Sequence, residues 1–410
     1  MKLTAILLIL SVLSIVSTCR RELATEPGEV KVRALTQSEK QVALASDEFG
    51  LDLFNKVVAD GENSNVFISP LSVSMALGMT LNGAAGETRT AMQKTLNFGD
   101  MSADEINGAY ASLIQLLRSI DPLVQFEIAN SMWTHVDFPV RQEFINTNKT
   151  FFDAMISALD FRAPAALKTI NGWVDQKTHG KIDKIIDTIP PDVVMYLINA
   201  IYFKGTWTFE FNKKETNDET FFVTENERVQ APFMRQTNDS LPYFENDLLQ
   251  MIDLPYGNRQ FSMTIILPRN NKSVSDIVSQ LDGANWTTWL GSLRRQKGTI
   301  QMPKFKLEYK KSLPDVLSAM GMGIAFSDAA DFSGINAEKR TSISDVIHKT
   351  FVDVYEEGTE AAAVTAVEIS LTSVGPSQGF FMRVDRPFIF TIREKSSGTI
   401  LFIGQVIRPV

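Results

Sequence analysis

The closest match to a catalytic pattern is the segment 375–379, which has the Gly-x-Ser-x-Gly spacing of a serine-hydrolase nucleophile elbow around Ser377. An elbow holds its serine on a sharp turn between a strand and a helix, and the histidine of that fold lies later in the chain. Here residues 380–384 have a strand pattern, and the last histidine, His348, precedes the serine. Both features disfavour hydrolysis, so we expect that the chain is not an enzyme.

Other side chains that could carry chemistry are sparse. The histidines are His135, His179 and His348, the one cysteine is Cys19, and no pair of them has the spacing of metal ligands. No phosphate-binding or dinucleotide-binding glycine motif is present. His348 falls on an uncharged face of a strand pattern, which favours a hydrogen-bonded core histidine over a catalytic one. We therefore expect no catalytic residue, no metal and no cofactor.

Length and composition indicate a large globular chain of 410 residues, 44% hydrophobic and 21% charged. The net charge is −8, and no run of Lys and Arg interleaved with aromatic residues occurs, so we expect no nucleic-acid partner. No internal repeat and no Pro/Gly-rich linker divides the middle of the chain. One large mixed domain is favoured over two.

The N-terminus has the layout of a signal peptide, with Lys2, an apolar run over 3–16 and then Ser17-Thr18-Cys19. The position of Cys19 resembles the lipobox of bacterial lipoproteins, although Thr18 departs from the usual residue before the cysteine, so lipidation and plain secretion both stay open. Residues 20–40 are polar without apolar period and predict a tether. We expect a signal peptide over 1–19, a tether over 20–40 and a domain over 41–410, in a secreted or cell-envelope protein.

Apolar periodicity predicts helices in the first half of the chain and strands in the second. Short buried strands are expected at 65–70 and 195–203, and the segments 388–392 and 399–403 read as a hairpin across 395–398. The predicted helices cover 42–60, 71–81, 87–96, 103–120, 142–156 and 274–290.

The segment 356–373 has a strand pattern that leads into a loop. Every second residue from Thr359 to Leu371 is small or apolar, whereas Glu360 and Glu368 fall on the other face. The residues that follow, 373–379, are rich in Gly, Pro and Ser and predict an exposed loop. The pattern therefore describes a half-buried strand whose far end is exposed.

Several motifs in order show that the chain resembles the serpin family from 43 to 410; they are 65–72, 83–88, 198–207, 385–388 and 402–406. The resemblance implies an α+β serpin fold with three β-sheets, about nine helices and an exposed reactive-centre loop. It also implies a serine-type endopeptidase inhibitor, which acts by cleavage of that loop, insertion of the loop into the main sheet and covalent trapping of the protease. The partner would be a target serine protease, and we expect the inhibitor to be a monomer.

The resemblance also assigns the site residues. The hinge and inserting face would be Glu356, Gly358, Thr359, Ala361, Ala363 and Thr365. A polar cluster under the sheet would comprise Ser69, Ser72, Asn199 and His348, and Trp207 would lie where insertion starts.

Counting from Gly358 at the spacing of the family places the reactive bond at Thr372-Ser373. Thr372 suits an elastase-like or subtilisin-like pocket and not a trypsin-like one, which requires Lys or Arg. A one-residue slip would place the bond at Leu371-Thr372 and favour a chymotrypsin-like protease. The small residues of the hinge favour inhibition; the alternative is a non-inhibitory binding or structural protein with the same fold.

Overall fold

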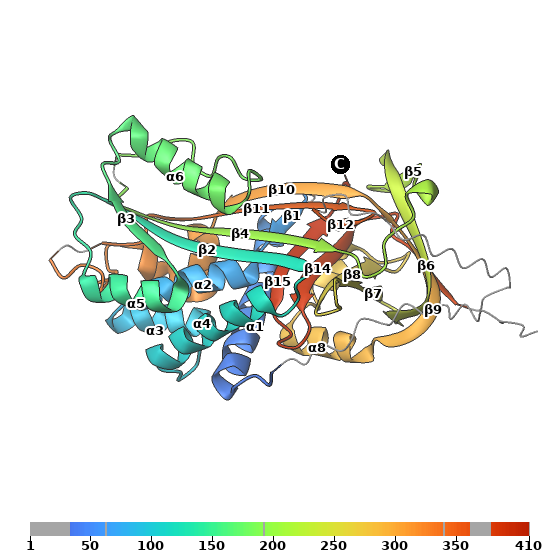
Figure 1. Cartoon of the computed structure of the whole chain (residues 1–410), viewed down its shortest axis with the longest axis horizontal. Coiled ribbons are helices and arrows are strands. Elements are labelled where there is room, and N and C mark those ends of the chain that lie inside the picture. Colours follow the sequence, from blue (N-terminus) through green and yellow to red (C-terminus); the bar gives the residue numbers. More distant parts are fainter. Residues whose placement is uncertain (1–32, 62–63, 192, 339–340, 361–378, 410) are drawn as a thin grey trace, which may run out of the picture.

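The computed structural model describes residues 33–61, 64–191, 193–338, 341–360 and 379–409 (Figure 1). Over these residues it contains nine α-helices, most of them in the first half of the chain as predicted. The helices are α1 (Gln37–Asp60), α2 (Pro70–Leu81), α3 (Gly86–Thr95), α4 (Ala103–Ser119), α5 (Gln142–Phe152), α6 (Pro164–Lys177), α7 (Val274–Val278), α8 (Gly283–Ser292) and α9 (Pro314–Leu317).

Fifteen strands are described, and they belong to two hydrogen-bonded networks. The strands are β1 (Val66–Ile68), β2 (Val124–His135), β3 (Met155–Leu159), β4 (Met195–Thr206), β5 (Asn217–Phe222), β6 (Arg228–Glu245), β7 (Leu249–Tyr256), β8 (Phe261–Pro268), β9 (Arg294–Pro303), β10 (Phe305–Ser312), β11 (Asp345–Tyr355), β12 (Gly358–Thr359), β13 (Phe380–Arg383), β14 (Phe388–Glu394) and β15 (Ile400–Val406).

The main sheet has six strands in the order β10-β11-β12-β4-β2-β3. Alternate residues of β4 face opposite sides: Leu197 and Ile201 join the large core under the sheet, whereas Ile198 joins a smaller apolar cluster with α6. In Figure 1, α6 lies on one side of this sheet, and α2 and α4 lie on the other. The buried pattern of β4 therefore has two causes, one helical layer on each face.

The second network has nine strands in the order β1-β15-β14-β8-β7-β6-β9-β13, with β5 paired to β6. A register shift between Asn238 and Leu241 interrupts the long strand β6. Before this shift β6 pairs with β5 and β9, and after it the strand reaches β7. The predicted α+β class is confirmed, and within this network β5, β9, β13 and the first part of β6 form a small sheet that continues into β7 through the end of β6.

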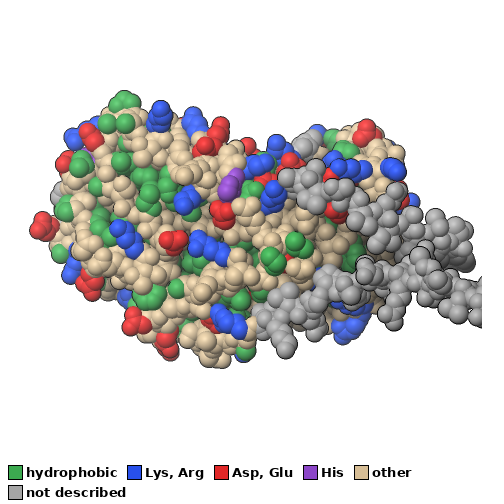
Figure 2. Space-filling view, in the orientation of Figure 1, with side chains coloured by type: hydrophobic (Ala, Val, Ile, Leu, Met, Phe, Trp, Pro, Cys, Tyr) green, Lys and Arg blue, Asp and Glu red, His purple; other side chains and the backbone are tan. Residues whose placement is uncertain are grey.

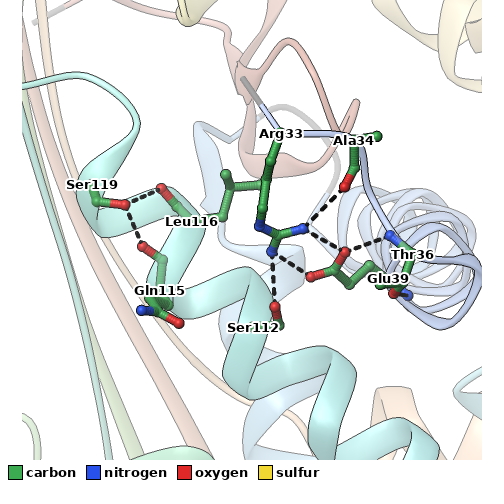
Figure 3. A network of polar contacts seen from close by, with 8 residues as sticks. All are labelled: Arg33, Ala34, Thr36, Glu39, Ser112, Gln115, Leu116 and Ser119. Atoms are coloured by element: carbon green, nitrogen blue, oxygen red, sulfur yellow. Dashed lines mark hydrogen bonds and ion pairs between the residues drawn. The ribbon is translucent and has the colours of Figure 1, made fainter. Parts of the chain in front are cut away.

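The helix α1 begins at Gln37, inside the segment over 20–40 that the sequence predicts as a tether. Thr36 and Glu39 form a capping box, in which each side chain accepts a backbone N–H of the other residue. The Arg33 guanidinium pairs with Glu39 and donates to Ser112 Oγ of α4 at 2.8 Å (Figure 3). Arg33, the first described residue, therefore connects the start of α1 to α4.

Two other boundaries differ from the sequence prediction. The helix expected over 142–156 ends at Phe152, because Asp153 adopts a left-handed conformation with φ of 51°, and the following residues pair with β2 as strand β3. The helix expected over 274–290 is two helices, since Asp282 caps a new helix start by accepting the N–H of Asn285. None of the described helices is long and apolar enough to cross a bilayer.

Charged residues of both signs share the surface. On the face shown in Figure 2, acidic and basic side chains are interspersed, and neither sign covers an extended area. This face offers no continuous basic field of the kind that nucleic-acid backbones require.

Candidate functional site

The candidate site lies where the central strands of the main sheet separate. Over the described residues, β4 and β11 pair in parallel from Asp345 opposite Tyr196 to Ile347 opposite Ile198. Farther along, β12 lies between them and pairs with β11 on one side and with β4 on the other. A seam between two central strands is therefore closed at one end and occupied at the other by the first residues of the 356–373 segment.

Gly358 fits this position because it has no Cβ. Its φ is 155°, a conformation that side-chain-bearing residues rarely adopt. A Cβ added at Gly358 would lie 2.1 Å from the carbonyl oxygen of Gly205 on β4. The close approach of β12 to β4 therefore requires glycine at this point of the hinge.

Thr359 enters the core beneath the sheet. Its side chain is 1% exposed, and its Oγ1 lies 2.6 Å from the hydroxyl of Tyr256 on β7. The Tyr256 ring stacks on Trp207, with ring centroids 4.3 Å apart and planes 12° from parallel. Burial raises the pKa of Tyr256, so its hydroxyl stays protonated and can donate to Thr359.

Trp207 holds the turn that precedes β12. Its backbone N–H donates to Glu357 O and its Nε1 donates to Tyr355 O, each at 2.9 Å. The residue predicted to lie at the start of insertion therefore contacts the hinge turn directly. Tyr256 was not predicted, because no local pattern connects a strand residue at 256 with a hinge at 359.

Three hinge glutamates each pair with a lysine from a different part of the chain. Glu356 pairs with Lys304 at 2.9 Å and accepts the Thr216 hydroxyl at 2.7 Å. Burial alone would raise the pKa of Glu356, but these two hydrogen bonds outweigh it and lower the pKa. Glu357 pairs with Lys213.

The third pair joins Glu360 to Lys181 at 2.9 Å on the outer face of the sheet. The Glu360 side chain is only 4% exposed, whereas that of Lys181 is 41% exposed. Burial raises the pKa of the neighbouring Tyr202, and the nearby Glu360 carboxylate raises it further. Thr359 and Glu360 thus point to opposite faces of the sheet, and Glu360, which follows the end of β12, has a left-handed φ of 55°.

The polar residues Ser69, Ser72, Asn199 and His348 come together under the seam. Ser69 donates its backbone N–H to His348 Nε2 at 3.0 Å and its hydroxyl to Leu401 O at 2.6 Å. Ser69 is also the N-cap of α2 and accepts the N–H of Ser72. Ser72 in turn donates to Asn199 Oδ1.

Asn130 belongs to the same cluster and was not predicted. It stands directly opposite Asn199 in the β2–β4 ladder, and its Oδ1 accepts from Asn199 Nδ2 at 2.6 Å. Its place as a polar residue within the apolar alternation of 124–132 was a sequence signal for this role. The cluster therefore extends from α2 across β4 to β2.

His348 is a buried, neutral member of the cluster. It is 2% exposed, and burial lowers its pKa to about 4. Because its Nε2 accepts the Ser69 N–H, we assign the ring proton to Nδ1. This histidine is a hydrogen-bond acceptor and not a general base for an external substrate.

Several predicted site residues lie outside the described residues. These are Ala361, Ala363, Thr365, Leu371, Thr372, Ser373, Ser377 and Cys19. The strand that follows them, β13, begins at Phe380, so a strand and not a helix comes after the segment with elbow spacing. Within the described ranges no group of His, Cys, Asp and Glu could hold a metal ion.

Comparison with known proteins assigns the fold to a family. A family model described as serpin (serine protease inhibitor) matches residues 44–409. Iripin-8 of Ixodes ricinus is 38% identical over 91% of this chain and 94% of its own length. An uncharacterized serpin-like protein of Thermococcus kodakarensis is 36% identical over 90% of this chain and 86% of its own.

Solved structures agree with the sequence relatives. The thermophilic serpin tengpin in its native state is 33% identical and superposes with a TM-score of 0.82, over 92% of this chain and 96% of that one. Human thyroxine-binding globulin in complex with thyroxine is 27% identical with a TM-score of 0.84, over 91% of this chain and 100% of that one. The chain belongs to the serpin family of serine protease inhibitors.

Proposed function

We propose that this serpin is a suicide-type inhibitor of serine proteases. A protease cleaves the segment after the hinge, and the freed strand inserts between β4 and β11 with the protease still attached as an acyl-enzyme. Serpins act as protease inhibitors and not as enzymes, which agrees with the neutral, buried His348.

The observation that carries this proposal is the position of β12. Gly358 and Thr359 already pair with both β11 and β4, in the line that a longer inserted strand would follow. Each further residue would gain ladder hydrogen bonds, and its inward side chain would gain about 25 cal/mol for each Å² of apolar surface removed from water. The inward positions after Thr359 are Ala361, Ala363 and Thr365, which are small enough to enter a packed sheet.

The residue before the cleaved bond determines the class of protease. We propose Thr372-Ser373 as the bond and an elastase-like or subtilisin-like enzyme as the target. Cleavage at Leu371-Thr372 would instead indicate a chymotrypsin-like target. Mass spectrometry of the products after reaction with elastase, subtilisin and chymotrypsin distinguishes the two bonds.

Complex formation tests the mechanism. The wild-type protein is expected to form a covalent complex with one of these proteases that survives denaturing electrophoresis. Thr359→Arg is expected to abolish the complex and leave a cleaved substrate, because an arginine buried unpaired beside Tyr256 costs several kcal/mol. Thr287→Arg on the exposed face of α8 is the matched control and should leave the complex intact. Cleavage without complex across the whole panel would refute inhibition.

The second candidate is a non-inhibitory binding protein, which the structural similarity to thyroxine-binding globulin supports. Thermal unfolding of intact and loop-cleaved protein discriminates the two functions. A large gain in melting temperature after cleavage indicates that the loop inserts, and no gain indicates that it does not.

We further propose that the chain is secreted or held at the cell envelope, by Cys19 if that residue is lipidated. Metabolic labelling with a radioactive fatty acid, compared between the wild type and Cys19→Ala, tests the anchor. Label in the wild type alone would support lipidation, and no label in either would support plain secretion.

A further inference from the structure

Asp121 is a buried carboxylate between the end of α4 and the start of β2. It is 2% exposed. Its two oxygens accept three N–H groups: the backbone N–H of Asn258 at 2.7 Å, Asn258 Nδ2 at 3.1 Å and the backbone N–H of Leu123 at 3.0 Å. A carboxylate that gives up hydration in this way holds its donors in a fixed geometry.

The donor Asn258 belongs to the turn between β7 and β8, and this turn is shaped around Asp121. Gly257 has a φ of +47°, and a Cβ at Gly257 would lie 2.8 Å from Asp121 Oδ2. The turn requires glycine both for its conformation and for the close approach of the carboxylate. Asp121 therefore fixes where the β7–β8 turn lies.

That turn is bonded to the end of β4. The Gly257 N–H donates to Thr206 O at 2.9 Å, and the Thr208 hydroxyl donates to Gly257 O at 2.8 Å. The Thr208 N–H donates to Pro255 O at 2.9 Å. The position of the turn therefore sets the position of the β4 end, against which Gly358 pairs.

The residue before the turn is Tyr256, whose hydroxyl meets Thr359 Oγ1 and whose ring stacks on Trp207. The turn thus positions two parts of the structure that contact the hinge. They are the end of β4, which pairs with Gly358, and the Tyr256 side chain beneath Thr359. Asp121 binds the turn through Asn258, on the side of β4 opposite to β12, and so helps to fix both of these parts.

We propose that Asp121 is a positioning residue for loop insertion, which keeps the β4 end and Tyr256 in the geometry that admits the first residues of the loop. This inference rests on the proposed inhibitory function. After cleavage the ester between the protease serine and the loop has two fates. Either insertion traps it, or water hydrolyses it and releases active protease with cleaved serpin. Slower insertion therefore leaves more of the ester to hydrolysis, so more serpin is consumed as an ordinary substrate.

The test compares Asp121→Ala with the wild type in two measurements. The rate of loop cleavage at saturating protease is expected to be unchanged, because Asp121 lies outside the loop. The number of serpin molecules consumed per protease inactivated is expected to rise. Its excess over one equals the rate of hydrolysis divided by the rate of insertion, so this excess grows about tenfold if insertion slows tenfold. A merely structural role would lower the melting temperature and leave this ratio unchanged.

Three further variants sharpen the result. Thr208→Val removes the hydroxyl bond to Gly257 and should raise the ratio in the same direction. Asp121→Asn keeps one acceptor oxygen and should fall between the alanine variant and the wild type. Asp282→Ala is the matched control, since Asp282 also accepts a backbone N–H at 2.7 Å, but in α8; it should leave the ratio unchanged.

A second readout separates this proposal from the proposed function. The rate at which loop-cleaved protein gains thermal stability reports insertion even without inhibition. If the wild type inserts but inhibits no protease, the proposed function fails, and slower insertion in Asp121→Ala still supports the role of Asp121. If folded Asp121→Ala inserts and partitions like the wild type, or if the wild type never inserts, the proposal for Asp121 is refuted.

Discussion

Removal of the Lys181 ammonium should release the hinge from the sheet without unfolding the domain. Lys181→Met keeps the long aliphatic side chain and removes the charge opposite Glu360. The Glu360 carboxylate would then remain almost fully buried beside Tyr202 without its cation. Because Glu360 ends the described hinge, the protein can avoid this cost by withdrawing a few residues from the seam.

The magnitude follows from the burial of the two partners. Breaking a fully buried ion pair costs about 3–5 kcal/mol. The Lys181 side chain is 41% exposed, so solvent screens part of the interaction, and we expect about 1–3 kcal/mol. That free energy would raise the population of the released hinge by roughly fivefold to 150-fold.

Hydrogen exchange measures this population. The Glu360 N–H donates to Asp353 O at 3.0 Å and exchanges when the hinge leaves the sheet. Its exchange should accelerate in Lys181→Met, while amides in the β2–β4 ladder stay unchanged. Lys184→Met is the matched control, because Lys184 pairs with the exposed Asp187 and not with the hinge.

Glu360→Gln closes the double-mutant cycle, since it removes the charge opposite Lys181 and keeps the size of the side chain. In that background Lys181→Met should have little further effect. An exchange rate within twofold of the wild type in Lys181→Met, or an equally large effect in both backgrounds, would contradict the assigned ion pair.

Three more predictions concern other positions. Asp47 is buried, and this burial raises its pKa to about 8. The folded protein therefore holds an extra proton between about pH 4 and 8, so the free energy of unfolding falls as the pH rises through this range. Asp47→Asn should gain about 1.4 kcal/mol per pH unit over the wild type in urea denaturation between pH 5 and 7. Burial lowers the pKa of His348 to about 4. Between about pH 6.5 and 4 the unfolded chain binds a proton that the folded protein does not, so the free energy of unfolding falls by about 1.4 kcal/mol for each unit that the pH falls. His348→Gln should lack this dependence on pH in the same assay. Gly358→Ala should move β12 away from β4, because its Cβ would overlap Gly205 O, and faster exchange of the Glu360 N–H would report this.

Sequence patterns predicted the elements whose environment is uniform along their length. The apolar run of β4 is buried on both faces, and the β14–β15 hairpin is buried throughout, so composition alone identifies each as a strand. The start of α1 was also present in the sequence, as the Thr36-x-x-Glu39 spacing of a capping box, but the polar composition before it was interpreted as a tether. The helix α6 was missed although Ala166, Ile170 and Val174 repeat at helical spacing behind Pro164.

The residues of the candidate site also differ in whether the sequence could predict them. Ser69, Ser72, Asn199 and Trp207 belong to continuous motifs, and the hinge and His348 lie in strand patterns, so the sequence alone could suggest these residues. The partners of the hinge could not be predicted, because Lys181, Lys213 and Lys304 lie in three segments far apart in the sequence. Only the folded sheet brings them to Glu360, Glu357 and Glu356. The same holds for Tyr256 and Asp121, whose roles depend on a turn that packs beside the end of β4.

The seam in the main sheet can open without leaving its polar core unsatisfied. Over the described residues, β4 and β11 pair directly at three positions, 196–198 with 345–347, and the polar cluster starts at the next residue of each strand, Asn199 and His348. The side-chain bonds of Asn199 go to Ser72 and Asn130, and His348 Nε2 accepts from Ser69; none of these bonds crosses from β4 to β11.

Under the proposed mechanism, further insertion must break these three residue pairs and disturb the apolar cluster that contains Ile198 of β4, Ile347 of β11 and residues of α6. Each broken backbone bond costs about 1 kcal/mol and is regained when the entering strand pairs with both neighbours. The barrier to this insertion is then concentrated at the seam, where the three residue pairs and the apolar cluster with α6 must separate. The ion pairs of Glu356, Glu357 and Glu360 hold the hinge at Thr359, so the insertion that we propose would begin from a strand that is already started.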